Sequence, residues 1–389
     1  MTSGILNSPY PLQRITDAEL QKLTQALWGW AICQPCLNGA ECLPPRCKWS
    51  QSTRLNPFFS FYKHVTASYV PELLPGWKPA LRSHGDIVDI ILLLRARQHC
   101  TRATLTHEYF SRRDHEPSLA DQHRAFNLVM QVITMVKCSA EGQPSAILEL
   151  GTQPLQWHSN TCQTDFMLKA FPKSTTLCLE NSLNHSRDLK SALTARRIQK
   201  VAKLTFEGTD DLRNHLRMNP CRGTVEIYHY TSVLKEHLAH DKSMACTSAP
   251  GLAVANVPRQ VALEVLDSIQ NILFPLDSDS EGILRDLVYR QSFDPDCLRY
   301  DWADGGEGDF SYIHFGGRLM DLFEEQQNPT PRSILEKWFQ RKSGARFMMM
   351  ATLVGILIAI TVGLLGLAVS IIQAWLAYQA WKHPIATPN

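Results

Sequence analysis

The chain has 389 residues, with 39 Lys and Arg against 37 Asp and Glu, and a formal net charge of +2. This near balance gives no electrostatic reason for DNA or RNA to bind, so we expect no nucleic-acid partner. Apart from a last apolar run, the length suffices for one large domain or two small ones.

Residues 1–82 are rich in Pro, Cys and aromatic side chains and predict an irregular region, with one short helix over residues 17–30. Proline-punctuated residues 56–79 predict packed chain without regular structure. Four cysteines of this region follow the spacing Cys33-x2-Cys36-x5-Cys42-x4-Cys47. Four thiolates suit a structural zinc ion, in a site that keeps no open position for chemistry. The spacing matches no standard zinc finger, and the alternative is packed or surface thiols.

Residues 83–160 predict a helical module with a small hairpin. We expect its helices to begin near Ser83, Thr101 and Ser118, residue types whose side-chain oxygen accepts a hydrogen bond from the first turn. Two short strands follow, over residues 146–150 and 154–157. This element order is that of a winged helix, which serves as a protein-interaction module as well as a DNA reader. The third helix has few basic residues, so DNA binding is not expected.

Residues 188–327 predict an α+β module with strands over residues 204–208 and 224–228 and several amphipathic helices. We expect Thr209 or Asp210 to cap a short helix that reaches Leu216. Apolar residues of these elements are expected to form one cluster: Leu212, Leu216, Val225, Ile227, Leu234 and Leu238. The predicted fold class is mainly α with small β elements (α+β), with winged-helix-like modules as one option and one C-terminal transmembrane helix.

A hinge and juxtamembrane helix are expected over residues 328–346, followed by a transmembrane anchor over residues 347–376. The apolar run from Phe347 to Trp381 contains no charged residue or histidine. About 20 such residues suffice to span a bilayer core, so the lipid bilayer is an expected partner. The alternative, a buried core helix of a soluble domain, fits neither this length nor the absence of charge.

The charges around this run predict the orientation of the chain. Basic residues stand before it at positions 337, 341, 342 and 346, and only Lys382 and His383 follow it. The positive-inside rule therefore places the N-terminal body in the cytosol and the C-terminus across the membrane. We expect this membrane to be the endoplasmic reticulum or another endomembrane. The first residues also lack the pattern of a secretory signal peptide. The sequon at Asn184 should then remain unmodified.

Small residues recur every four positions on one face of the predicted span, at Gly355, Ala359 and Gly363. Such rows let helices approach closely in lipid, and they predict a homo-oligomer formed through the transmembrane helix. The alternative is that small residues are simply common in spans.

Several segments resemble a large family of C-terminally membrane-anchored proteins from filamentous ascomycete fungi. The resemblance covers roughly residues 70–385. It rests on residues 208–216 and 233–238, on Ser292-Phe293-Asp294-Pro295-Asp296-Cys297-Leu298-Arg299, and on Ser343-Gly344-Ala345-Arg346 before the span. Most members of the family have no known function, and the resemblance implies no catalytic residue. The cysteine-rich N-terminal part lies outside these segments.

Two functions are compatible with the sequence. It has no phosphate-binding loop, nucleophile elbow or dinucleotide fingerprint. We therefore expect a non-enzymatic, membrane-tethered interaction or accessory protein with protein partners. The alternative is a membrane-bound accessory enzyme of a fungal secondary-metabolite pathway. In that case Asp210, Asp211, His215 and His229 are expected to line a pocket.

Overall fold

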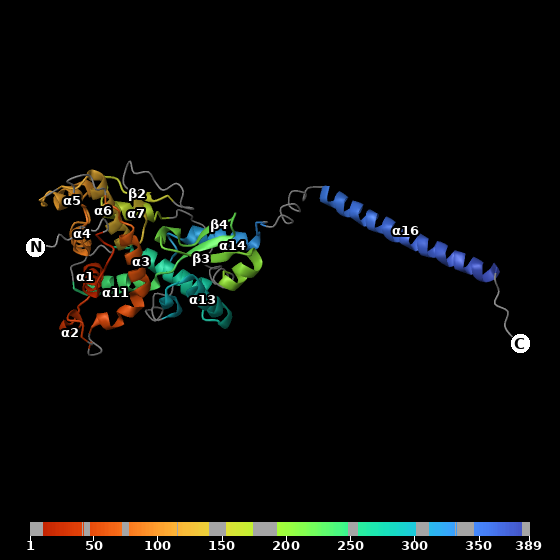
Figure 1. The fold of residues 1–389 in the computed structure, drawn as a ribbon, viewed down its shortest axis with the longest axis horizontal. Helices are drawn as coiled ribbons and strands as arrows, with labels where there is room; N and C mark the ends of the chain where they lie inside the picture. Colours follow the sequence, from red (N-terminus) through yellow and green to blue (C-terminus); the bar gives the residue numbers. More distant parts are fainter. Residues whose placement is uncertain are drawn as a thin grey trace, which may run out of the picture. The chain divides into compact units, whose positions relative to one another are not determined.

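The computed structural model describes residues 11–40, 42, 47–71, 78–114, 116–139, 153–173, 193–247, 256–300, 311–330, 332 and 346–382. It is 63% helix and 7% strand, which confirms a mainly α chain with small β elements. The chain forms two compact units, Met1–Pro329, hereafter the body, and Thr330–Asn389 (Figure 1). The expected boundaries inside the body, near residues 82, 160 and 188, stay predictions.

Helix α1 (Asp17–Trp28) begins with a capping box. The Glu19 N–H lies 3.3 Å from Thr16 Oγ1, and the Thr16 N–H donates back to Glu19 Oε2 at 2.7 Å. The helix ends at Gly29, whose φ of +64° is a left-handed conformation that glycine adopts without strain. Two short elements follow, α2 (Gln34–Leu37) and the 3₁₀ helix η1 (Lys48–Leu55).

Residues Asn56–Ala67 form helix α3, although their proline and aromatic content predicts irregular chain. Pro57 stands in the first turn, where a missing N–H costs no helical hydrogen bond. Phe58, Phe61, Tyr62 and Val65 are buried and follow helical spacing on one face. The proline therefore marks the start of a helix, and the N-terminal region contributes to the core of the body.

Helices α4 (His84–Ala96), α5 (Arg102–Phe110) and α6 (Leu119–Thr134) begin after Ser83, Thr101 and Ser118, as predicted. Strands β1 (Cys138–Ser139) and β2 (Leu155–Gln156) then pair in parallel. A hairpin joins antiparallel strands, so this pair is not the predicted hairpin, and a winged helix is not shown. The strand expected over residues 146–150 lies outside the described residues.

A three-stranded sheet lies in the second half of the body, in the order β3-β5-β4. Strand β5 (Thr224–Tyr228) pairs in parallel with β3 (Thr205–Thr209) and antiparallel with β4 (Arg217–Asn219). Helix α13 (Ser278–Gln291) contacts β3 and helix α14 (Gly316–Gln327) contacts β4 (Figure 1). The remaining described elements of the body are α7 (Gln163–Ala170), α10 (Ala195–Arg197), η3 (Ile198–Ala202), η4 (Leu212–Asn214), α11 (Thr231–Thr247), α12 (Arg259–Asp267), η5 (Ser268–Leu273), α13 (Ser278–Gln291), η6 (Pro295–Leu298) and α14 (Gly316–Gln327).

The predicted apolar cluster is present in this half. Five of its six residues are buried in the body's core and Leu238 packs against it partly buried, so the cluster is confirmed. The predicted helix up to Leu216 is instead the single 3₁₀ turn η4, after which Leu216 takes a φ of +59° and leads into β4. Asp211 caps this turn, accepting the Arg213 N–H at 3.0 Å, so the predicted cap at Thr209 or Asp210 is wrong.

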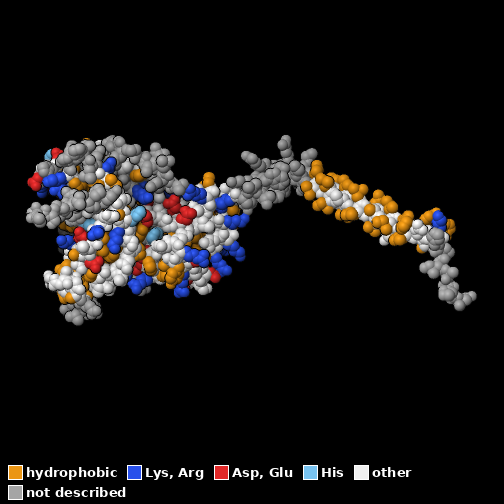
Figure 2. Space-filling model, viewed as in Figure 1, with side chains coloured by type: hydrophobic (Ala, Val, Ile, Leu, Met, Phe, Trp, Pro, Cys, Tyr) orange, Lys and Arg blue, Asp and Glu red, His pale blue; other side chains and the backbone are white. Residues whose placement is uncertain are grey.

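Helix α16 (Arg346–Lys382) belongs to the second unit. Its segment from Thr352 to Lys382 includes an 18-residue window with a mean hydropathy of 2.6, none of which is buried in protein, and this makes the helix a candidate membrane span. Figure 2 shows apolar side chains along its length. Pairing through Gly355, Ala359 and Gly363 stays a prediction.

Candidate functional site

Four cysteine side chains meet near the start of the body. The Sγ atoms of Cys33, Cys36, Cys42 and Cys47 all lie within 4.8 Å of one another. The Cys33 and Cys42 sulfurs are 3.7 Å apart, and the Cys36 and Cys47 sulfurs are 3.9 Å apart. These separations are far beyond the sulfur–sulfur bond of a disulfide, about 2.05 Å. The cluster could bind a metal ion such as zinc.

A tight turn presents the first two of these cysteines. Pro35 stands in the first turn of α2, where it needs no helical hydrogen bond. The Ala40 N–H donates to the Pro35 carbonyl at 2.8 Å, and the chain reverses through Gly39 at a φ of +73°. The Gln21 side chain of α1 donates to the Cys36 carbonyl at 3.0 Å, which attaches the turn to the core.

The four thiols are electrostatically unequal. Burial raises the pKa values of the Cys36 and Cys42 thiols above their usual value. Burial acts in the same direction on Cys47, but the backbone N–H groups of Cys33 and Trp49 oppose it, and its pKa falls to about 7. The Cys33 N–H lies 3.4 Å from the Cys47 sulfur. The thiolate is the form that binds a metal, and the two backbone donors favour this form at Cys47.

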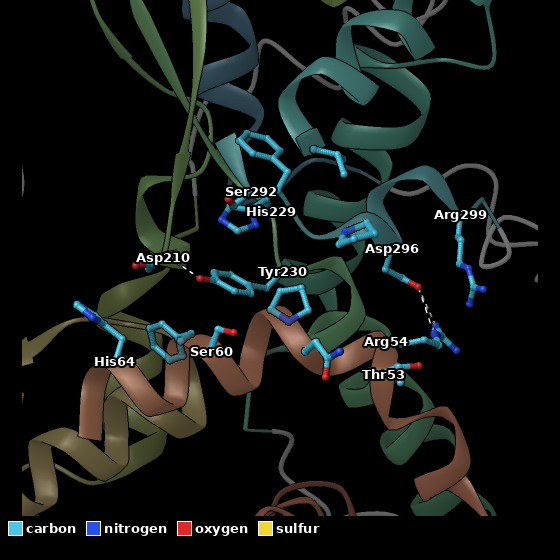
Figure 3. Close-up of a pocket in the computed structure, with 16 residues that line it drawn as sticks. Thr53, Arg54, Ser60, His64, Asp210, His229, Tyr230, Ser292, Asp296 and Arg299 are labelled. Carbon is cyan, nitrogen blue, oxygen red and sulfur yellow. Dashed lines mark hydrogen bonds and ion pairs between the residues drawn. The ribbon is translucent and has the colours of Figure 1, made fainter. Parts of the chain in front are cut away.

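A cavity of about 780 Å³ opens on the surface of the body (Figure 3). Four stretches of the chain form it: the end of η1 with α3, the loop after β3, the loop after β5, and the segment from α13 to the end of η6. Its lining combines aromatic rings, hydroxyls and charges of both signs: Thr53, Arg54, Asn56, Pro57, Ser60, Phe61, His64, Asp210, His229, Tyr230, Val288, Ser292, Phe293, Pro295, Asp296 and Arg299.

An ion pair joins two of these stretches. The Arg54 guanidinium contacts one carboxylate oxygen of Asp296 at 3.1 Å, and the Lys235 ammonium lies 2.7 Å from the other oxygen. The Asp296 side chain is 2% exposed. A buried carboxylate needs such partners, because removing a charge from water is costly. The pair therefore holds η1 to the segment around η6 at the edge of the cavity (Figure 3).

Three polar side chains lie together on another wall. The Tyr230 hydroxyl donates to Asp210 at 2.7 Å. The His229 ring stacks between the rings of Tyr230 and Phe293, with centroid distances of 4.2 and 4.8 Å. Its Nδ1 accepts the Asp294 N–H at 3.1 Å, so the neutral ring carries its proton on Nε2. Burial lowers the His229 pKa to about 4, and the ring is neutral at neutral pH.

The structure divides the four polar residues that the enzyme hypothesis groups together. Asp210 and His229 line the cavity, but Asp211 caps η4. His215 is fully buried, and its Nε2 lies 2.7 Å from the Ser268 hydroxyl oxygen. That hydroxyl donates to a backbone carbonyl, so the imidazole N–H is the donor to it. Burial lowers the His215 pKa well below its usual value. His215 is therefore a structural residue of the core.

Arg54 and Tyr230 are among the cavity residues that sequence reasoning misses. Arg54 lies in η1, a segment without the apolar periodicity that would predict a helix. Tyr230 directly follows strand β5 and belongs to no recognisable sequence motif. Asp296 falls in a segment of the family resemblance, but no local pattern shows that its partner is an arginine 242 residues away. The three converge only through the tertiary fold.

No protein-family model, no curated protein and no solved structure matches this chain.

Proposed function

We propose that this chain is a single-pass membrane protein whose body faces the cytosol and binds a protein partner. Helix α16 carries the proposal, because residues Thr352–Lys382 are long and apolar enough to cross a membrane. Lipid supplies the surroundings that such a helix requires. The basic residues before the helix support a cytosolic body. We propose the endoplasmic reticulum or another endomembrane as the site of the anchor.

The lining of the cavity supports an interaction role. Aromatic and arginine side chains dominate the energetics of protein interfaces, and the lining contains Phe61, Tyr230 and Arg299. An enzyme nucleophile needs a base within hydrogen-bond reach. Among the residues that the structure describes, neither Ser60 nor Ser292 hydrogen-bonds a histidine. The cavity therefore resembles a recognition surface more closely than a hydrolytic site.

Site-specific cross-linking in native membranes tests the interaction. A photoreactive amino acid at His64, exposed on the cavity wall, should cross-link a defined protein. The same group at Lys169, exposed on α7 and not part of the cavity lining, should not. Adding Asp210→Lys should abolish the His64 product, because it reverses a charge inside the cavity. Identical products from His64 and Lys169, unchanged by Asp210→Lys, would contradict a partner in the cavity.

A second candidate function is a membrane-bound accessory enzyme of a fungal secondary-metabolite pathway. The observation that favours it is the shared wall of Asp210, Tyr230 and His229, where a carboxylate, a phenol and a neutral imidazole meet. Asp210→Asn keeps the size of the side chain and removes its charge. In the native host, the enzyme hypothesis requires this variant to reproduce the metabolite profile of a gene deletion while the protein stays folded. An unchanged profile for both strains would contradict catalysis in such a pathway.

A further inference from the structure

The stretch around the four cysteines has almost no apolar core of its own. Of the described residues between Ala31 and Arg54, only Cys36 and Cys47 are buried. Small segments that cannot bury enough apolar surface are ordered by disulfides or by a metal ion. A metal ion would supply such a constraint here, and the two buried residues among those described in this stretch are both thiols.

The four sulfurs have the arrangement of a tetrahedral metal site. A zinc–thiolate bond is about 2.3 Å long, so the corners of a regular tetrahedron of sulfurs are about 3.8 Å apart. Two of the observed separations are 3.7 and 3.9 Å, and all others are within 4.8 Å. We propose that Cys33, Cys36, Cys42 and Cys47 bind a single structural Zn²⁺ ion in a closed tetrathiolate site.

The surroundings of the sulfurs favour a metal over two disulfides. Disulfide formation would require each sulfur pair to close to about 2.05 Å. A body on the cytosolic side of the membrane would also meet a reducing environment, in which thiols persist. The backbone N–H of Cys33 points to the Cys47 sulfur at 3.4 Å, and such donors stabilise thiolate ligands of a metal.

The proposed ion also positions one wall of the cavity. Before the cluster, the Trp30 indole donates to Glu236 of α11 at 2.9 Å. After it, Cys47 leads directly into η1, whose Arg54 contacts Asp296 at 3.1 Å. Loss of the ion should free the stretch between these two attachments. This consequence for partner binding rests on the proposed function, as does the reducing environment around the thiols, whereas the sulfur geometry that defines the metal site does not.

Elemental analysis tests the site in the full chain, purified in detergent under reducing conditions without added metal. We expect about one zinc ion per chain. Exchange with Co²⁺ should give the visible and thiolate charge-transfer absorption of tetrahedral cobalt. Cys36→Ser and Cys42→Ser should each lose most of the zinc. Cys221→Ser is the matched control, since this exposed thiol lies outside the cluster, and it should keep the ion.

Three results would overturn the assignment: a folded wild-type chain with far less than stoichiometric zinc, iron in place of zinc, or disulfides among the four cysteines in alkylation mass spectrometry. Should the serine variants fail to fold, the cobalt spectrum of the wild-type chain decides. A spectrum without thiolate charge-transfer bands would exclude ligation by these sulfurs.

Chelation separates the metal site from the role of the cavity. Zinc removal should make the peptide bonds after Lys48 and Arg54 more susceptible to trypsin, and it should reduce the cross-link from His64. Stoichiometric zinc without any His64 cross-link, before or after chelation, would contradict the interaction function and support the metal site. A His64 cross-link and a tryptic pattern that both survive zinc removal would contradict the positioning role of the ion.

Discussion

The guanidinium of Arg54 and the carboxylate of Asp296, 242 residues apart in the chain, form an ion pair in the body. Both Nε and one NH2 group of Arg54 bind the same oxygen, at 3.2 and 3.1 Å. The Arg54 side chain is 26% exposed and that of Asp296 only 2%, and Lys235 occupies the second oxygen. A single buried carboxylate thus connects the N-terminal region to the second half of the body.

Removing that carboxylate should cost more than removing its outer partner. Asp296→Asn should destabilise the body by about 3–5 kcal/mol, because two cations lose their counter-charge at a buried site. Arg54→Met should cost only about 1–3 kcal/mol, since Lys235 still pairs with Asp296. Urea unfolding of the body measures both losses.

Arg285→Met is the matched control for this comparison. It breaks an ion pair with Glu281 whose two side chains are 60% and 42% exposed, so it should change stability by less than about 0.5 kcal/mol. A loss for Asp296→Asn no larger than that of the control would mean that the Arg54–Asp296 pair contributes nothing to the fold.

Ending the chain at Asn328 should give a soluble, folded body. The body forms a compact unit up to Pro329, and none of the apolar window of α16 is buried in protein. Deletion of the helix therefore leaves this compact unit whole. Gel filtration and circular dichroism test this. Aggregation of the truncated chain, or loss of its cooperative melting, would show that the body needs residues beyond Asn328.

The sheet core of the body should be more sensitive to Leu212 than to an exposed leucine. Leu212→Ala should cost about 2–5 kcal/mol, because the side chain is fully buried in the cluster.

His215→Ala removes the acceptor of the buried Tyr228 N–H and should cost about 1–3 kcal/mol. Leu276, 79% exposed, provides the control, and its alanine variant should change stability by less than about 0.5 kcal/mol.

The melting curve and the cellular phenotype of these variants together test the role of His215. An unchanged melting curve for His215→Ala, combined with a lost phenotype in the native host, would assign chemistry to His215 and contradict its structural role.

His229 should make the body less stable as the pH falls from about 6.5 to about 4. Burial lowers its pKa in the folded state from the usual 6.5 to about 4. The unfolded chain therefore binds the proton first. The contribution of neutral His229 to the free energy of unfolding is fully present above pH 6.5. It declines by up to about 3 kcal/mol as the pH falls through this window.

The pH comparison must remove the effect of Asp294, whose N–H binds the His229 ring. Burial raises the Asp294 pKa to about 6, which acts in the opposite direction over the same range. His229→Gln keeps Asp294, so the difference between wild type and variant isolates the histidine. Urea unfolding should show the wild type losing stability relative to His229→Gln as the pH falls. A difference independent of pH would contradict a buried, neutral His229.

Local signals predict the elements whose stability is local. Ser83, Thr101 and Ser118 mark the starts of α4, α5 and α6 because their side chains or backbones satisfy first-turn groups within the same few residues. Helix α16 is equally visible, since its length and composition alone make it a candidate membrane span. Helix α3 is missed because prolines and aromatic residues suggest irregular chain, although Pro57 is compatible with a first turn.

Contacts between distant segments are not encoded in any local pattern. The parallel pairing of β1 with β2 depends on the path of the chain between them. Strands of two residues are also too short for a hydrophobic periodicity, so the sequence does not predict whether they pair in parallel or antiparallel. Likewise, the sequence nominates Asp211 and His215 with Asp210 and His229, but only tertiary packing decides which of them lie in the cavity. The cysteine cluster is the exception, because all four thiols lie within one short stretch.

The most direct test of the account is a glycosylation map of the full chain in its native host. A C-terminal extension with an N-glycosylation sequon, placed far enough beyond Lys382 to clear the membrane, reports the far side of α16. The native sequon at Asn184 reports the body. We predict an endoglycosidase-sensitive mobility shift that depends on the added sequon and persists in Asn184→Gln. A shift that depends on Asn184 would place the body in the lumen, and a complete absence of glycan would contradict a helix that crosses the membrane.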